Sequence, residues 1–122
     1  MRLSDRTEGL ISDTDIGYQY CVDLVRDFAR GAVQLHVMHH AQSGEVHGTA
    51  LIEELGRHGH RLSPGTLYPM LHRLADGGLL ASRDVVVDGR RRRLYSATAA
   101  GRRAFRQCQA ALRELADEVL PP

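Results

Sequence analysis

The side chains best suited to chemistry are guanidinium groups gathered in one part of the chain. All 16 basic residues are Arg, and eight of them lie between positions 83 and 106 with only two acidic residues, although the whole chain carries a formal charge of +1. Arg bonds phosphate oxygens and guanine edges through paired N–H donors. The near-neutral total therefore conceals a basic segment that suits a nucleic acid, with Arg90, Arg91 and Arg92 as candidate DNA contacts.

A second set of polar side chains begins at Ser63 and interleaves with apolar residues at helical spacing. Hydroxyl groups commonly bond phosphates, and an Arg bonds either a phosphate or a base edge. These polar residues are expected on the outward face of one helix. They could contact DNA there, and the alternative is that they only form a solvated surface. The candidate DNA contacts in this part of the chain are Ser63, Thr66, Tyr68, His72 and Arg73, with His47 and Thr49 from the segment before them.

Two of the seven histidines, His36 and His40, are spaced i, i+4 and would share one face of a helix. Such a pair can supply two ligands to a metal ion. No regular Cys and His spacing completes a site, however, and helical histidines are often simply exposed or packed, so metal sensing stays an alternative reading. The sequence requires no cofactor and leaves open a small-molecule or metal effector.

The two cysteines, Cys21 and Cys108, lie far apart on separate apolar stripes. A buried, inert thiol is expected at each, and a redox switch is the alternative. This cysteine usage and the lack of a secretory leader indicate a reducing cytoplasm. No apolar run approaches the roughly 18 residues of a membrane helix, so no membrane partner is expected.

Motifs typical of enzymes are missing from the sequence. It contains no G-x-S-x-G, no H-E-x-x-H and no Walker-type G-x-x-x-x-G-K-[ST], and its glycines mark turns rather than a phosphate-cradling loop. We therefore expect no catalytic residues and no enzyme activity.

The elements that would position these side chains follow from periodicity. A helix is expected to begin at 12–15, because Ser12, Asp13 and Asp15 supply N-cap and first-turn acids. Its apolar stripe includes Ile16, Tyr20, Leu24 and Phe28, and Gly31 is a point where it could break or bend before it reaches Gln42. A second helix is expected from Val46 to Leu55.

The third helix has the clearest signals. Ser63 is placed to cap it, Pro64 occupies the first helical position, and Gly77 and Gly78 are able to take positive φ at its end. Its buried face is predicted to comprise Leu67, Met70, Leu71 and Leu74. A β-hairpin is expected next, over 79–87 and 90–97, with Asp88-Gly89 as the turn and the arginine run 90–93 at its exposed tip.

The last helix is expected to start after Thr98 and to carry a short coiled-coil seam. Since a seam on a solitary helix has no partner in a compact core, burial against a second copy is the simplest solution. The predicted dimer interface comprises Phe105, Cys108, Leu112, Leu115 and Val119, with Ile16, Tyr20 and Leu24 as further candidates.

This order of elements predicts a mainly α fold with a small β-hairpin, namely a winged helix-turn-helix DNA-binding domain with a C-terminal dimerisation helix. The expected parts are an N-terminal arm and helical extension (1–29), the winged domain (30–97) and the dimerisation helix (98–122). The predicted function is sequence-specific regulation of transcription by a homodimer on double-stranded DNA with a pseudo-palindromic site. A helical module that binds another protein is the alternative.

Several motifs also resemble a known family. The segment from Leu62 to Leu74 contains Ser-Pro-Gly-Thr-Leu-Tyr-Pro, and together with His47-Gly48, Gly78-Leu79-Leu80 and 89–95 it is similar to the PadR-like transcriptional regulators. The resemblance implies a prokaryotic, dimeric winged-helix repressor that a small effector relieves, of the compact subgroup with one C-terminal helix. The chain departs from the family in having Thr49 where an aromatic residue is frequent, and in having no Trp.

Overall fold

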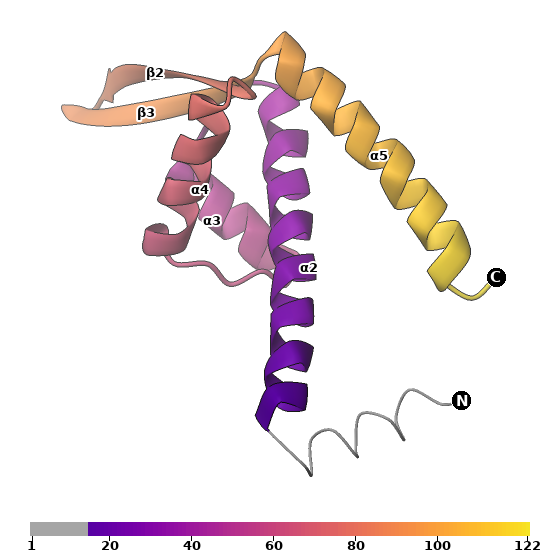
Figure 1. The fold of residues 1–122 in the computed structure, drawn as a ribbon. Coiled ribbons are helices and arrows are strands. Elements are labelled where there is room, and N and C mark those ends of the chain that lie inside the picture. Colours follow the sequence, from indigo (N-terminus) through magenta and orange to yellow (C-terminus); the bar gives the residue numbers. More distant parts are fainter. Residues whose placement is uncertain (1–14) are drawn as a thin grey trace. The chain divides into compact units, whose positions relative to one another are not determined.

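The computed structural model describes residues 15–122, and their side chains from residue 20 onward. The described elements are α2 (Asp15–Gln42), β1 (Val46–His47), α3 (Gly48–Arg57), α4 (Pro64–Asp76), β2 (Leu80–Val87), β3 (Arg90–Ala97) and α5 (Ala99–Val119) (Figure 1). This mainly helical fold with a small antiparallel sheet confirms the predicted winged-helix class. Residues 33–122 form one compact unit, and the described residues before them belong to another.

Helix α2 runs without interruption past Gly31, which therefore does not break it. The border between the two compact units falls inside this helix, after Ala32. In the first unit the side chains of Tyr20, Leu24 and Phe28 share one apolar stripe. All three are largely exposed. The predicted first turn at residues 12–14 and the side chain of Ile16 lie outside what the structure describes.

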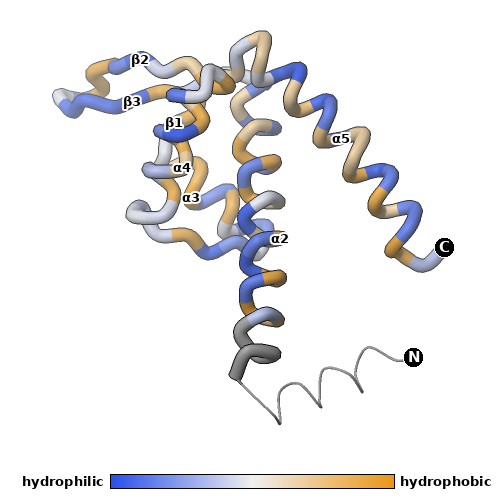
Figure 2. Tube along the Cα trace, viewed as in Figure 1, coloured by the Kyte–Doolittle hydropathy of each residue, from blue (hydrophilic) through white to orange (hydrophobic). Residues whose placement is uncertain are grey.

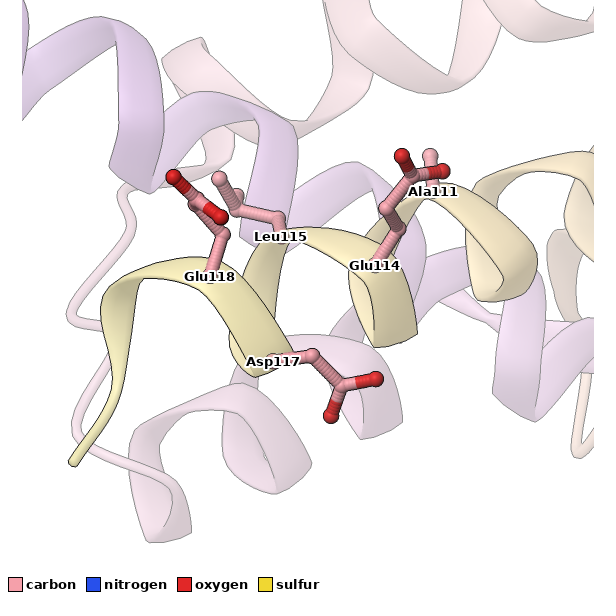
Figure 3. Close-up of a pocket in the computed structure, with 5 residues that line it drawn as sticks. All are labelled: Ala111, Glu114, Leu115, Asp117 and Glu118. Atoms are coloured by element: carbon pink, nitrogen blue, oxygen red, sulfur yellow. The ribbon is translucent and has the colours of Figure 1, made fainter. Parts of the chain in front are cut away.

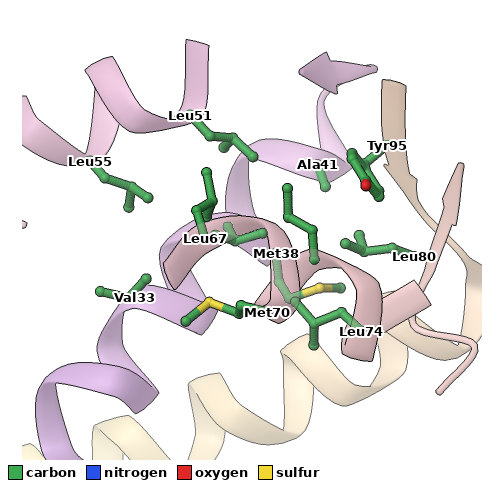
Figure 4. Packing of buried hydrophobic residues seen from close by; sticks show 12 residues of the cluster. Val33, Met38, Ala41, Leu51, Leu55, Leu67, Met70, Leu74, Leu80 and Tyr95 are labelled. Atoms are coloured by element: carbon green, nitrogen blue, oxygen red, sulfur yellow. The ribbon is translucent and has the colours of Figure 1, made fainter. Parts of the chain in front are cut away.

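The hydrophobic core of the second unit is mainly aliphatic, with Tyr95 as a buried aromatic member, and is shared by the end of α2, by α3 and α4, and by the sheet (Figure 4). The prediction for α4 is confirmed, because all four apolar residues of its inner face are buried. The core comprises Val33, Val37, Met38, Ala41, Leu51, Leu55, Leu67, Met70, Leu71, Leu74, Leu80 and Tyr95.

The sheet has the strand order β1-β3-β2, with both pairings antiparallel. Strand β1 was not expected, since the sequence indicated a helix from Val46; the helix α3 instead begins at Gly48. Val46 pairs with Tyr95 and His47 pairs with Leu94. A strand of two residues is too short to show an alternating pattern, which explains the error.

The β2–β3 hairpin confirms the prediction of a tight turn at Asp88-Gly89. Asp88 has φ +52° and Gly89 has φ +74°, as a two-residue type I′ turn requires. The arginine run does not occupy the turn itself, because Arg90 to Arg93 are the first residues of β3 and pair with residues 84–87 of β2. Strand geometry therefore sends alternate guanidinium groups to opposite faces.

Helix α5 starts as the sequence predicted. The Thr98 hydroxyl oxygen accepts the backbone N–H of Gly101 at 3.0 Å and donates to the carbonyl of Gly78 at 2.6 Å. Gly101 is buried so closely that a Cβ there would lie 2.1 Å from the Leu79 carbonyl oxygen. Hydrophobic and hydrophilic residues alternate along the rest of α5 (Figure 2). None of the described helices combines the length and the apolar character needed to span a bilayer.

Candidate nucleic-acid interface

Helix α4 separates an inner apolar face from an outer polar one. Its inner face is held in the core, so the helix cannot rotate without exposing four buried side chains. The side chains of Thr66, His72 and Arg73 are exposed on the outer face, with Ser63 exposed just before the helix. This rigid placement brings together the polar residues that the sequence identified on this segment and directs them to solvent.

The N-terminus of α4 has hydroxyl groups but no acidic residue in its first turn. Ser63 has the extended backbone of an N-cap residue, yet its side chain makes no capping bond; its Oγ lies 3.3 Å from Oγ1 of Thr66 instead. The expected side-chain cap is therefore wrong, because the hydroxyl turns to Thr66. Both hydroxyls sit at the positive end of the helix dipole, which favours an anion such as a phosphate.

Tyr68 connects α4 to the start of α3. A Cβ added to Gly48 would lie 2.5–2.6 Å from ring atoms and the hydroxyl of Tyr68, so the ring packs directly on the backbone of this glycine. The Tyr68 side chain is still 37% exposed, which leaves part of it accessible to a partner. Only a residue without a side chain fits beneath it.

His47 is the N-cap residue of α3. Its Nδ1 accepts the backbone N–H of Ala50 at 3.3 Å. This bond leaves the other ring nitrogen, Nε2, to carry the proton of the neutral imidazole and to donate to a phosphate. Thr49 follows in the first turn with an exposed side chain. Both candidates thus lie at a second helix N-terminus beside Tyr68.

The guanidinium groups of the hairpin, here called the wing arginines (Arg90, Arg91 and Arg92), differ from their neighbours in their bonding. Within the described part of the chain these three have no ion-pair partner. Arg93 Nε, in contrast, donates to Oδ1 of Asp84 at 3.1 Å, and this hydrogen bond raises the pKa of Arg93. The wing arginines are therefore available to phosphates.

Arg83 makes a fork-like ion pair with Glu45, across the sheet from its own strand. Its Nη2 donates to Oε1 of Glu45 at 2.6 Å and its Nε donates to Oε2. The hydrogen bond from Arg83 lowers the pKa of the Glu45 carboxyl. This pair joins the residue before β1 to β2, so part of the basic segment stabilises the wing rather than contacting a partner.

The residues proposed for dimerisation fall into two groups. Phe105 is partly buried against the core, where its ring centroid lies 6.2 Å from that of His39. Leu112, Leu115 and Val119 are 48%, 45% and 62% exposed.

Cys21 and Cys108 are exposed thiols, so the expectation that both would be buried in the chain is wrong. Their exposure follows from the exposure of the stripes that carry them.

The C-terminal half of α5 also lines a shallow pocket. Its five lining residues, shown in Figure 3, are Ala111, Glu114, Leu115, Asp117 and Glu118. All of them belong to one helix and three carry a carboxylate. A hollow with one helix as its wall does not enclose a small molecule, so this surface is better suited to contact with a larger partner.

His36 meets two further histidines that sequence reasoning missed, His58 and His60. The ring centroid of His36 lies 5.1 Å from those of both His58 and His60. Burial lowers the pKa of His36, and the nearby His60, His58, His40 and His39 lower it further, which favours its neutral form. Spacing along the chain could not show this cluster, because a loop after α3 brings His58 and His60 back to α2.

Comparisons with known protein sequences find transcriptional regulators. A model of the transcriptional regulator PadR-like family matches residues 37–107. The chain is 60% identical over 96 residues to the transcriptional regulator Rv3488 of Mycobacterium tuberculosis, which covers 79% of this chain and 90% of that protein.

Solved structures show the same fold. A PadR family transcriptional regulator from Eggerthella lenta superposes with a TM-score of 0.72 at 31% identity, covering 85% of this chain and 93% of that one. A transcriptional regulator from Clostridium thermocellum gives a TM-score of 0.65 at 20% identity, covering 78% and 99% of the two chains.

Proposed function

Since this chain belongs to the PadR-like family of transcriptional regulators, we propose that it acts as a homodimeric repressor on a pseudo-palindromic operator. Regulators of this family act by binding DNA and are not a class of enzyme. Beyond family membership, the proposal specifies that the protein is a dimer, that it represses transcription, and which residues contact DNA. In this proposal the protein works in the cytoplasm, and an effector relieves the repression.

The observation that carries the proposal is the polar outer face of α4 combined with the wing arginines, which have no ion-pair partner in residues 20–122. We assign Thr66, His72 and Arg73 to the major groove, which admits one α-helix and displays distinct donors and acceptors for each base pair. Arg73 is the candidate for a base edge, and Ser63 and Tyr68 for phosphates. The wing arginines contact the flanking backbone.

A second group of phosphate contacts belongs to the start of α3 in this proposal. His47 offers Nε2–H, and the first backbone N–H groups of the helix point the same way as its positive dipole end. Thr49 adds a hydroxyl. Contacts of this kind determine how deeply and in which register α4 enters the groove, without reading sequence themselves.

The dimer rests on the unpartnered seam of α5. Leu112, Leu115 and Val119 recur at alternating spacings of three and four residues and remain exposed. Pairing with the same helix of a second copy would bury them around a two-fold axis. Such symmetry duplicates α4, so half-sites should lie about one or two DNA turns apart, at roughly 34 Å per turn. The apolar stripe with Tyr20 and Leu24 is a further candidate for this interface.

Selection from a pool of random duplexes with the full-length chain tests the proposal. We expect enrichment of an inverted repeat, and affinity for it that falls log-linearly as salt concentration rises. A reporter gene placed behind the selected site should be repressed when the protein is expressed. A chain that only binds other proteins through its helices would enrich no duplex, and this result would reject DNA binding as its function.

A further inference from the structure

Four histidines and one glutamate from three segments meet beside the loop that leads into α4. His36 and His40 come from the last turns of α2, Glu54 from α3, and His58 and His60 from the loop after it. Nε2 of His58 lies 3.3 Å from Oε1 of Glu54, and Nε2 of His40 lies 3.8 Å from the same oxygen. One carboxylate oxygen thus faces two imidazole nitrogens.

One atom of this cluster has no bonding partner in the described part of the chain. Nε2 of His40 is buried from solvent and makes no hydrogen bond, because its separation from Glu54 is too long for one. A buried nitrogen without a hydrogen-bond partner is unfavourable, and a ligand that bonds this nitrogen would remove that cost. This nitrogen faces the Glu54 carboxylate, and imidazole and carboxylate groups are both metal ligands.

Three pairwise separations in the cluster are close to those between two ligands of one tetrahedral metal ion. With metal–nitrogen bonds of about 2.0–2.1 Å, two ligand atoms on zinc lie about 3.4 Å apart and two imidazole centroids lie about 5 Å apart. The corresponding values here are 3.3 and 3.8 Å for the atoms that face Glu54 Oε1, and 5.1 Å for the rings of His36 and His58.

We propose that His36, His40, Glu54 and His58 form a binding site for a divalent transition-metal ion of the zinc class. Nitrogen ligands with one carboxylate suit zinc and its neighbours in the first transition row better than Mg²⁺ or Ca²⁺, which prefer oxygen. His60 packs edge-on against His36 at an interplanar angle of 64°, which orients that ring as an outer-shell residue.

Binding requires a modest rearrangement, because no three donors in residues 20–122 already surround a common point. The His58 side chain is 51% exposed, so it can rotate toward the other ligands out of its 3.3 Å contact with Glu54. Arg57 donates to Oε2 of Glu54, so Oε1, which faces His58 and His40, is the oxygen that Arg57 leaves to a metal ion. The positive charge of Arg57 opposes the ion, which weakens the site relative to one without a nearby cation.

Occupation of this site would join three segments of the chain, and one of them is the loop that leads into α4. The loop from His58 to Ser63 connects α3 to α4, so a metal bound to His58 and to α2 restricts how α4 is presented. Metal binding itself does not depend on DNA binding. Its measurement therefore separates this inference from the proposed function.

The test is calorimetric titration of ZnCl₂ into the chelator-treated, tag-free full chain. Because exposed thiols also bind zinc, all proteins carry Cys21→Ser and Cys108→Ser. We expect one ion per chain, with affinity that falls as pH drops from 7.5 to 6 because the imidazoles must be neutral. Glu54→Gln and His58→Gln should each weaken binding at least about 10- to 100-fold, and His60→Gln should weaken it by about tenfold.

The matched control is His72→Gln, which removes an exposed histidine of α4 away from the cluster and should leave zinc affinity unchanged. His58 is itself exposed, so its replacement is not expected to unfold the protein, and far-UV circular dichroism checks this for each variant. The inference is overturned if the cysteine-free chain binds no zinc. It is equally overturned if Glu54→Gln and His58→Gln bind zinc as tightly as the control does.

Discussion

At the scale of single residues, several side chains that the sequence offered as contacts also hold the scaffold together. His47 caps α3, Tyr68 packs on Gly48, and Arg93 pairs with Asp84. Spacing along a chain identifies a residue type suited to a partner, but it does not show which of its atoms are already bonded. Among the residues that the structure describes, Arg90, Arg91 and Arg92 are the members of the arginine run without an ion-pair partner.

The contact between Tyr68 and Gly48 makes a prediction about stability. Gly48→Ala places a methyl group where the tyrosine ring lies, so it should lower the free energy of unfolding by about 1–3 kcal/mol. Gly56→Ala is the matched control in the same helix, because no described atom lies within 4 Å of its added Cβ. That change should be neutral or stabilising by about 0.4–1 kcal/mol. Urea denaturation measures both, and equal effects would contradict the packing described here.

The environment of His36 predicts a dependence of stability on pH. Its pKa in the folded chain is below the ordinary 6.5, so the unfolded chain binds more protons as the solution is acidified. The contribution of His36 to the free energy of unfolding should therefore be fully present above about pH 6.5. It should decline as the pH falls below that value. In the presence of EDTA, His36→Gln should flatten this decline in thermal melts. An unchanged slope in His36→Gln would assign the effect to another group.

At the scale of elements, the sequence was most informative where local chemistry dictates the backbone. Pro64 at the first position of α4, the Asp88-Gly89 turn and the Thr98 cap each have a local cause, and all three are found as predicted. Strand β1 could not be predicted, since its two residues are extended only because β3 lies beside them. The His58–His36 contact likewise depends on tertiary packing.

The wing predicts a change in the salt dependence of DNA binding. Replacing Arg90, Arg91 and Arg92 together with Ala should weaken binding to every duplex, because phosphate contacts do not read sequence. Each lost phosphate contact lowers the slope of log affinity against log salt by about 0.9. Since the strand sends Arg91 to the face opposite Arg90 and Arg92, we expect a loss of about one or two contacts.

Arg113→Ala, on the exposed part of α5, is the control for this experiment. Fluorescence anisotropy with labelled duplex at several salt concentrations gives the slopes. An unchanged slope in the triple variant would remove the wing from the proposed interface and leave α4 and the start of α3 to provide the phosphate contacts.

At the scale of the whole molecule, the proposed assembly depends on α5. Leu112→Glu would place a carboxylate in the centre of the seam, where burial of an unpaired charge is costly, so the variant should be monomeric. Ala110→Glu introduces the same charge on the opposite side of this helix and should leave the dimer intact. Sedimentation velocity distinguishes the two, and a dimeric Leu112→Glu would move the interface elsewhere, for instance to the stripe with Tyr20 and Leu24.

The central claim is that α4 reads the sequence of an operator, and the ratio of operator affinity to random-duplex affinity tests it most directly. Replacing Arg73 with Ala should reduce operator binding by about 1–3 kcal/mol, or roughly 5- to 150-fold, while binding to random duplex changes much less. The affinity ratio should therefore fall for Arg73→Ala and stay constant for the control Arg113→Ala. A ratio that remains unchanged in both Arg73→Ala and Thr66→Ala would contradict the assignment of α4 as the recognition helix.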